Sequence, residues 1–599
     1  MTNATTSRRS LLAGLGVAAT SAGCVGRVRN IAGRDSASQL TLELMTTPAD
    51  ADPHGIRIAR HLSENLEAVG IATRVNTVSE ADLHRNVLLN HDYDVYVGQF
   101  SEAEPFDPDA LYSLLHSRFA EETGWQNPFG LTELAIDEML DEQRSVPESN
   151  RPSVVADLLE TVGEIQPFNV VAFPDSLTAV REGSFEGWET GRPTSASGLL
   201  QLEYTGDTDD EEPVTLQLAT TDDRITENLN PIAAEYRRHG TFTDLLYDPL
   251  VRSESGTRIP WLAADWEWDG DAGMLRVTLR DANWHDGEPI TAADMAFTYE
   301  FLGDTSLGEA ETPVPAPKYR GRSSLIESSE VVDSRTVELT LVETSKTVAQ
   351  RVLEVPVLPA HIWSELTDPA TIAGIEIDEE TTEAVVWNNE EPVGSGPLIF
   401  EESTAESEVT FHANEEHFLR QDSESTPAEI PSAYAGGPAY DRMLIEVVPS
   451  DIAAVQAVGD GLADATASNL GPDAVPRIGR EANAKLVSAR SAAFYHVGYN
   501  ARQSPLSNPR FRGILSGLLD KQVVVEETFQ GYAAPAATPL AASPQWVPAS
   551  LQWDDETGTD PKHPFYSENG ELDAERVREE IRDAGYRYNE AGELLARGQ

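Results

Sequence analysis

Hydrophobic and polar residues alternate in several short stretches of the chain, and each such stretch predicts a β-strand. Residues 40–47 (LTLELMTT) place leucine at alternate positions, which is the period of a strand with one buried face. Apolar side chains then recur at helical spacing over 55–70, and Gly70 ends that run. Further strands are predicted over 71–78 and 93–100. The order strand, helix, strand predicts a βαβ unit and therefore an α/β lobe.

The pattern continues to about residue 180 and starts again after an acidic segment. Helices are predicted near 130–141 and 152–164, before the extended stretch PFNVVAFPDSLTAV. Residues 201–213 (QLEYTGDTDDEEP) lack periodicity and predict a linker. The elements predicted after it are a strand at 214–221, a hairpin at 261–280, a capped helix at 292–302, an amphipathic helix at 450–465, a strand at 494–500 and a helix that begins after Asn508.

The first 24 residues have the layout of an export signal. Arg8 and Arg9 precede a short apolar run, and small residues then lead to Cys24, the single cysteine of the chain. Paired arginines predict twin-arginine export, and the SAGC sequence predicts a lipidated cysteine. The alternative is a cleaved signal with an incidental cysteine. The run is too short to span a bilayer of about 30 Å, so the mature protein is expected to be anchored by lipid rather than to span the membrane.

The charge of the chain is strongly negative. It has 101 Asp and Glu against 43 Lys and Arg, for a formal net charge of −58. Such a surface repels nucleic acid and anionic lipid, so no nucleic-acid partner is expected. The acids are spread over the whole chain rather than gathered in a tail. We interpret the excess as adaptation to high salt, where a Debye length of about 3 Å screens the repulsion.

The sequence lacks the common catalytic motifs. It contains no G-x-S-x-G, H-E-x-x-H, phosphate-binding loop or C-x-x-C. His285 and Asp286 lie in a predicted turn before a helix cap, which favours a structural role. His412 and His417 are not spaced to present two metal ligands on one helix face. We therefore predict that the protein is not an enzyme and needs no metal or cofactor.

One long stretch carries a family resemblance. Residues 279–302 (LRDANWHDGEPITAADMAFTYEFL) resemble the signature of the family 5 extracellular solute-binding proteins, the oligopeptide and dipeptide receptors of ABC importers. Matching pieces follow in the family's order across 214–599, including FTDLLYDPLV, IPWLAADWEW, VGSGPLIF and FYHVGYNARQSPLSNPRFRGILSGLLDKQVVV. The resemblance implies an α/β fold, the two-lobed periplasmic-binding-protein-like fold of type II with an extra subdomain.

The order of the segments implies a circular permutation of that fold. Residues 40–200 resemble the C-terminal third of the family, although they stand first in this chain. The new termini would lie at the 599/40 junction, and the family's old termini would be joined through 201–213. Surface termini that lie close together tolerate such a change. Two decayed tandem copies are the alternative. Permutation predicts that Leu594 points toward the strand at 40–44 in the same lobe.

The resemblance implies a domain organisation with two chain crossings and hinge strands near 166–172 and 490–500. The predicted parts are a signal at 1–24, a tether at 25–39, the first part of lobe two at 40–165, a return to lobe one at 166–200, the linker at 201–213, lobe one at 214–493 with its subdomain at about 262–390, and the second part of lobe two at 494–599.

By resemblance, ligand would be trapped when the lobes close. The loop GQFSEAEPFDP matches the position where relatives bind a peptide's amino terminus, so Glu102 and Glu104 are candidate amine partners and Phe100 a candidate apolar wall. This loop lacks the usual Trp after its Gly, which puts a peptide site in doubt. Surface acids and core aromatics are the structural alternatives. The full set of candidate ligand residues is Phe100, Glu102, Glu104, Tyr247, Asp248, Gly394, Gly396, Tyr495, Tyr499 and Asn500.

The function implied by the resemblance is that of an extracytoplasmic, lipid-anchored binding protein. It would capture a small solute, with a peptide as the favoured class, and deliver that solute to ABC permease subunits at the cell surface. The protein itself is expected to be a monomer. Peptide, sugar and metal chelate all stay open as substrates. The alternatives are a ligand-sensing receptor partner and an exported enzyme on the same fold.

Overall fold

The computed structural model describes residues 38–100, 107–188, 193–206, 213–233, 240–254, 256–372, 375–376, 381–420, 429–568 and 570–596. Arg8, Arg9, Cys24, Glu102 and Glu104 lie outside these ranges, and so do the signal and most of the predicted tether.

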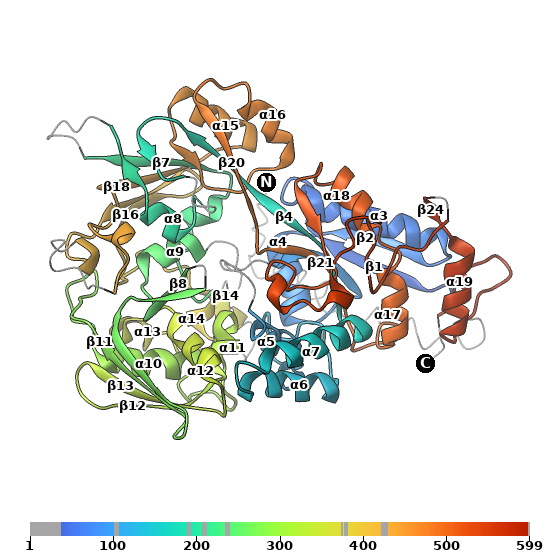
Figure 1. Ribbon diagram of the computed structural model, residues 1–599, viewed down its shortest axis with the longest axis horizontal. Helices are drawn as coiled ribbons and strands as arrows, with labels where there is room; N and C mark the ends of the chain where they lie inside the picture. Colours follow the sequence, from blue (N-terminus) through green and yellow to red (C-terminus); the bar gives the residue numbers. More distant parts are fainter. Residues whose placement is uncertain are drawn as a thin grey trace, which may run out of the picture.

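A sheet of 12 strands runs through the described part of the molecule (Figure 1). Its main path, in spatial order, is β16 (Leu398–Thr404), β17 (Glu408–Ala413), β18 (Arg442–Val447), β7 (Thr215–Thr220), β19 (Ala465–Thr466), β4 (Phe168–Arg181), β21 (Phe494–Tyr499), β3 (Val95–Phe100), β1 (Thr41–Thr46) and β2 (Ala72–Thr77). Two further strands, β20 (Ala484–Arg490) and β22 (Ala533–Pro535), pair with β4.

The strand β4 contributes to the hydrophobic cores of both lobes. Its first half, through Phe173, packs with residues of 40–170 and 494–594, which form lobe two. Its second half, from Leu177, packs with residues of 196–487, which form lobe one. The change of core therefore comes later than the predicted return at 166, because Phe168 and its neighbours still pack in lobe two. The second crossing lies between Val487 on β20 and Phe494 on β21.

Lobe two is a sheet covered by helices on both faces. Successive side chains of a strand point to opposite faces, so Val95 and Val97 pack on one core while Tyr96 and Phe100 pack on the other. The helices of the first core are α3 (Pro53–Ala68), α17 (Pro509–Ser516), α18 (Lys521–Glu527) and α19 (Ala574–Asp583). Those of the second are α5 (Ala110–Leu115), α6 (Leu134–Ser145) and α7 (Arg151–Ile165).

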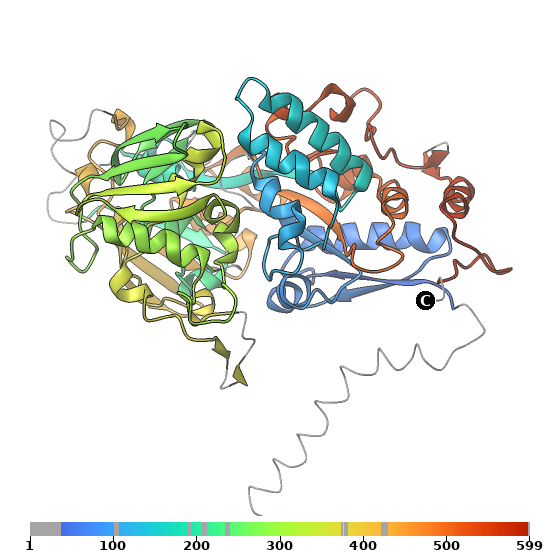
Figure 2. The same ribbon diagram turned by 90° about the horizontal axis from the view of Figure 1, so that it is seen from below.

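Lobe one carries a second sheet in a subdomain, visible in Figure 2. Its four strands stand in the order β10 (Ala263–Asp269), β11 (Met274–Leu279), β13 (Thr336–Leu341) and β12 (Ile326–Val331). The predicted hairpin is confirmed as β10 and β11. The predicted helix after it is α10 (Ala292–Gly303), which begins with the predicted capping box of Thr291 and Asp294. On the main sheet, α15 (Asp451–Asp460) covers the face opposite the large core.

The last described residues lie beside the start of β1 (Figure 2). Leu594 is fully buried and shares a core with Leu40, Leu42 and Leu44, as predicted. The Leu40 N–H donates to the Leu594 carbonyl at 2.7 Å. The pairing is antiparallel, so the final segment lies alongside the strand rather than in line with it. The junction is tight, because a Cβ on Gly70 would come within 2.2 Å of the Gly592 carbonyl oxygen.

His285 ties the turn at 394–396 to the core of lobe one. Its Nδ1 accepts the N–H of Gly394 at 3.2 Å, and its Nε2 lies 3.0 Å from the carbonyl oxygen of Gly396, to which it donates. This arrangement satisfies the neutral ring and places a donor against Nδ1, where a second proton would sit. Burial lowers the pKa of His285 to about 4, although the hydrogen bond with Gly396 and the charge of Asp248 oppose that shift. The structural role predicted for this histidine is confirmed.

The lowered pKa of His285 predicts a loss of stability in acid. Its folded pKa lies below the unfolded value of about 6.5, so the unfolded state binds more protons and stability falls as the pH drops from 6.5 toward 4. Between pH 7 and pH 5 the free energy of unfolding should fall by about 2 kcal/mol on account of this group. Denaturant unfolding in molar salt should show that loss abolished in His285→Gln and retained in His412→Gln, a change at an exposed histidine. Equal pH dependence in both variants would contradict the assignment.

Candidate functional site

The carboxyl ends of strands from the two lobes face each other across their junction. β3 is antiparallel to β21, which is antiparallel to β4, so β3 runs with β4 toward lobe one. β7 is parallel to β19, which is antiparallel to β4, so β7 runs toward lobe two. Ligands of open α/β sheets bind outside the carboxyl ends of their strands. The candidate site is therefore the junction between Phe100 and Thr220, where β3 and β7 end.

Aromatic side chains gather at the end of β3. Phe100 is 2% exposed and stacks on Phe494, with ring centroids 5.2 Å apart. Trp125 lies edge-on to Phe100 at 6.4 Å and to His84 at 5.3 Å. His84 ends the short helix α4 (Glu80–His84). Phe100 is thus placed at the junction, as part of an aromatic cluster, and the segment with Glu102 follows it outside the described residues.

Tyr247 and Asp248 lie inside the core of lobe one. The Tyr247 hydroxyl accepts a hydrogen bond from Asn389 at 2.8 Å, and burial raises its pKa. Asp248 is fully buried and accepts from the Trp261 indole at 2.6 Å and from His417 at 3.0 Å. A carboxylate with these partners is already satisfied by the protein. The contacts favour structural roles for both residues.

Gly394 and Gly396 allow a close approach to protein backbone. The turn that holds them packs on the end of α9 (Gly240–Leu246). A Cβ on Gly394 would lie 1.9 Å from the Leu246 carbonyl oxygen, and one on Gly396 would lie 2.2 Å from that of Leu245. The lack of a side chain is therefore explained by helix packing, without a ligand.

Tyr499 and Asn500 are held inside lobe two. The Tyr499 hydroxyl lies 3.0 Å from the Ser516 hydroxyl, and its side chain is fully buried. The Asn500 amide donates to the carbonyl oxygens of His91 and Tyr93 at 3.0 and 2.9 Å. Both residues fasten the strand end to neighbouring loops, and these contacts too favour structural roles.

Tyr495 lies nearer the crossing between the lobes. Its hydroxyl donates to Asp52 at 2.9 Å, and Asp52 also caps α3 by accepting the N–H groups of His54 and Gly55. The His54 ring stacks on Phe529 at 4.6 Å. Burial lowers the pKa of His54, while Asp52 opposes that shift. These groups form a polar cluster at the carboxyl end of β1.

Sequence reasoning missed a charged contact that bridges the junction. Arg224 lies in the short helix η3 (Asp223–Thr226), just after β7, and its Nη1 donates to Glu80 of lobe two at 2.8 Å. Its Nε also donates to Asp222 at 2.8 Å. A basic residue directly after the end of a strand, in a chain so rich in acids, is the signal that could have identified it.

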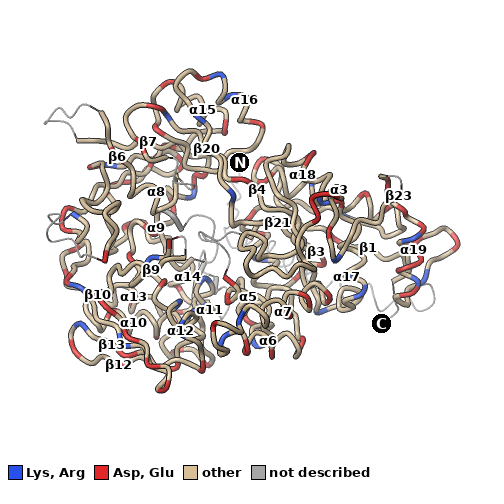
Figure 3. Tube along the Cα trace, viewed as in Figure 1, with Lys and Arg blue, Asp and Glu red and all other residues tan. Residues whose placement is uncertain are grey.

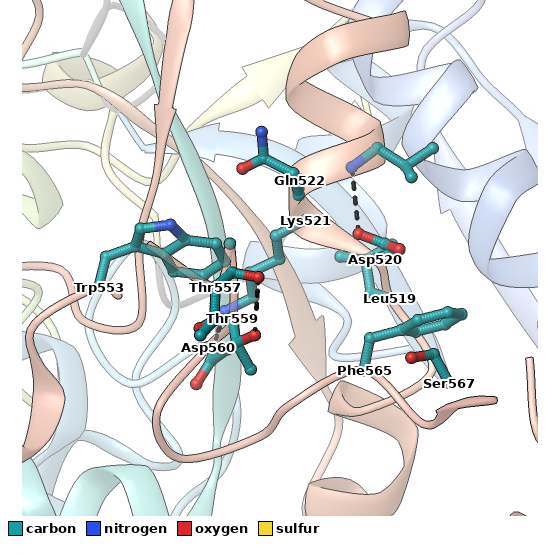
Figure 4. Close-up of a pocket in the computed structure, with 12 residues that line it drawn as sticks. Leu519, Asp520, Lys521, Gln522, Trp553, Thr557, Thr559, Asp560, Phe565 and Ser567 are labelled. Atoms are coloured by element: carbon teal, nitrogen blue, oxygen red, sulfur yellow. Dashed lines mark hydrogen bonds and ion pairs between the residues drawn. The ribbon is translucent and has the colours of Figure 1, made fainter. Parts of the chain in front are cut away.

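A cavity of about 210 Å³ lies within lobe two, away from the junction (Figure 4). Its walls come from the start of α18 and the 553–567 loop. Lys521 donates to Asp560 at 2.5 Å and to the Ala536 carbonyl at 2.9 Å. Burial opposes ionisation of Asp560, but Lys521 and two backbone N–H groups hold its pKa below the usual value. The pair fastens α18 to the loop, and no residue of lobe one is among those that line the cavity.

The described ranges hold neither a cluster of metal ligands nor a membrane-spanning helix. No group of three or more His, Cys, Asp or Glu side chains there is arranged to hold a metal ion. Within the same ranges, the helices are too short or too polar to cross a bilayer.

Curated relatives match part of this chain. A Brucella ovis protein assigned as the peptide-binding protein of an ABC transporter is 24% identical over 313 residues, which is 52% of each chain. The oligopeptide-binding protein AppA of Bacillus subtilis is 23% identical over 48% of this chain and 47% of its own. Heme-binding protein A of Haemophilus influenzae is 22% identical over 57% of this chain and 56% of its own. The chain thus spans about half the length of the curated relatives it matches.

Solved structures match at similar coverage. NikZ of Campylobacter jejuni, in complex with Ni(L-His), is 20% identical with a TM-score of 0.44 and covers 64% of this chain and 66% of its own. AppA of Bacillus subtilis, in complex with a nonapeptide, is 17% identical with a TM-score of 0.43 and covers 65% and 68%.

The family model gives the assignment. The model of bacterial extracellular solute-binding proteins, family 5, middle region, matches residues 257–597, more than half of the chain. The match includes the subdomain and the later half of lobe two. The chain belongs to family 5 of the extracellular solute-binding proteins.

Proposed function

We propose that the protein captures a solute between its two lobes and delivers it to an ABC permease, with no chemical step. The observation that carries this proposal is the facing carboxyl ends of β3 and β7, in a molecule whose lobes are joined by β4 and by β20 with β21. Paired crossing strands can bend without breaking either core, which suits lobe closure about a hinge. Family membership supports the same reading.

We propose a peptide as the solute. The relatives from Brucella ovis and Bacillus subtilis are named for peptide binding. Glu102 and Glu104 stay the candidate partners of a peptide amine, and Phe100 stays the candidate apolar wall. The heme-binding relative favours a wider range of solutes in the family, so sugars and metal chelates belong in any screen. A sensing partner or an exported enzyme on this fold remains the alternative.

The proposal includes a location at the outer face of the membrane. Arg8 and Arg9 would direct twin-arginine export, and Cys24 would carry the lipid. The net charge of −58 supports a protein that works in high salt. The protein would act as a monomer beside its permease subunits.

We also propose that the chain is a circular permutant of its family. Three observations support this proposal. Residues 40–173 share their cores with 494–594 although they lie at opposite ends of the chain. The family match ends at residue 597 and leaves 40–173 outside it. Leu594 and Leu40 are joined by a backbone hydrogen bond.

A solute screen by thermal unfolding in molar salt tests the binding function. Di- to pentapeptides, oligosaccharides and metal chelates would be compared. A peptide at a hundredfold excess over its Kd should stabilise the fold by about 2.7 kcal/mol. The double variant Glu102→Gln and Glu104→Gln should weaken binding of a free-amine peptide more than of its N-acetylated form, while Glu138→Gln should change neither. If a sugar raised the unfolding temperature and no peptide did, the peptide assignment would be wrong.

A rearranged chain tests the permutation. Residues 207–599 would be joined to 38–206 through a short Gly/Ser linker, so that the chain opens between Gly206 and Asp207, within the predicted linker at 201–213. Since Ala596 and Ser38 are already hydrogen-bonded at 2.8 Å, this protein should fold with nearly unchanged denaturant stability and solute binding. The control keeps the same join but opens between Val97 and Gly98 within β3, and it should be strongly destabilised. If the first rearrangement failed to fold, the proposal would lose its physical basis.

A further inference from the structure

The ion pairs found between the bodies of the two lobes, in the ranges that the structure describes, share one polarity. In each of them the arginine comes from lobe one and the carboxylate from lobe two. The pairs are Arg224 with Glu80 at 2.8 Å, Arg320 with Glu122 at 2.9 Å, and Arg351 with Asp107 at 3.3 Å and with Asp109 at 3.7 Å.

Arg320 makes the best-formed of these contacts. It begins α11 (Arg320–Ser323) of lobe one. Its Nε and Nη2 each donate to one oxygen of Glu122 at 2.9 Å, which is the two-pronged arrangement that favours arginine over lysine. Their side chains are 16% and 26% exposed. Partial burial limits screening by salt and makes the pair worth more than a fully exposed one.

Arg351 sits on a buried network of lobe two. It lies in η6 (Gln350–Glu354) and faces Asp107 and Asp109. Arg144 holds Asp109 through contacts of 2.6 and 3.2 Å and also donates to a carbonyl oxygen of α11 at 2.9 Å. Burial opposes ionisation of Asp107, but Arg351 and Arg151 lower its pKa to about 2. Asp107 therefore stays charged at neutral pH.

The polarity matters because both lobes are acidic. Figure 3 shows acidic positions over the whole trace and fewer basic ones. Two such bodies repel each other when they approach. In the described ranges, three arginines of lobe one stand where the lobes meet, each opposite a lobe two carboxylate: Arg224, Arg320 and Arg351. At molar salt, a Debye length of about 3 Å screens the distant repulsion but leaves contact pairs largely intact.

We propose that Arg224, Arg320 and Arg351 form a clasp with the lobe two carboxylates that stabilises the closed arrangement of the lobes and so tunes solute affinity. The effect of the clasp on solute affinity rests on the proposed function, whereas its effect on the arrangement of the lobes does not. Apparent affinity falls in proportion to the fraction of molecules in the binding-competent arrangement. A weaker clasp would therefore lower affinity without touching any residue that contacts the solute.

Charge reversal tests the clasp in the absence of solute. Glu138→Cys on α6 and Glu330→Cys on β12, both exposed, would carry a fluorophore pair in the full chain with Cys24→Ser. Single-molecule energy transfer in molar potassium chloride would then give the ratio of open to closed molecules. Arg320→Glu should raise that ratio by about tenfold or more, because two carboxylates would then face each other. Adding Glu122→Arg should restore the original ratio.

The controls separate a clasp from a general effect of charge or folding. Arg442→Glu breaks an exposed pair with Glu401 inside lobe one and should leave the ratio unchanged. Arg224→Gln removes the contact with Glu80 and should also raise the ratio of open to closed molecules. This change introduces no new charge, so it carries less risk to folding. The denaturant midpoint would show that each variant is folded. The clasp would be overturned if folded Arg320→Glu and folded Arg224→Gln both kept the original ratio. It would also be overturned if adding Glu122→Arg to Arg320→Glu did not restore that ratio. Since no solute is present, a failed solute screen would leave this result unaffected.

Discussion

The fold depends on one strand, β4, that packs in the cores of both lobes. β4 contributes Phe168 through Phe173 to lobe two and Leu177 through Val180 to lobe one. It pairs with β21 along its first half and with β20 along its second. Because both lobes are built on this strand, their sheets are continuous and their strand ends are set against each other. The directions of the strands beside β4 thus determine which strand ends meet at the junction of the two lobes.

The second constraint is electrostatic. A chain with a net charge of −58 has few basic residues to spare, yet several arginines lie between the lobes or beside that contact. Some of these pairs are buried enough to be insulated from salt, such as Arg144 with Asp109, whose side chains are each 3% exposed. The same salt that screens the outer surface leaves such contacts in place. The proposed adaptation to high salt and the proposed clasp would therefore use different sets of charges.

The sequence predicted the elements better than the site. Periodicity and caps located β1, α3, α10 and α17 to within a few residues, because those signals are local. The burial of Leu594 beside Leu40 also followed from pattern, but its antiparallel pairing did not, since register depends on the turn that precedes it. Tyr247, Asp248 and Tyr499 stand near strand or helix ends, where cleft and core residues look alike. Only long-range partners such as Trp261, His417 and Ser516 decide between them.

The proposed function requires that solute binds between the lobes and draws them together. Small-angle X-ray scattering of the full protein in molar salt, titrated with a peptide or other solute identified by thermal shift, tests it directly. The radius of gyration should fall as solute is added and should saturate at the same concentrations as binding. Closure around the solute would be contradicted if a protein that is open without solute bound it saturably and kept the same radius of gyration.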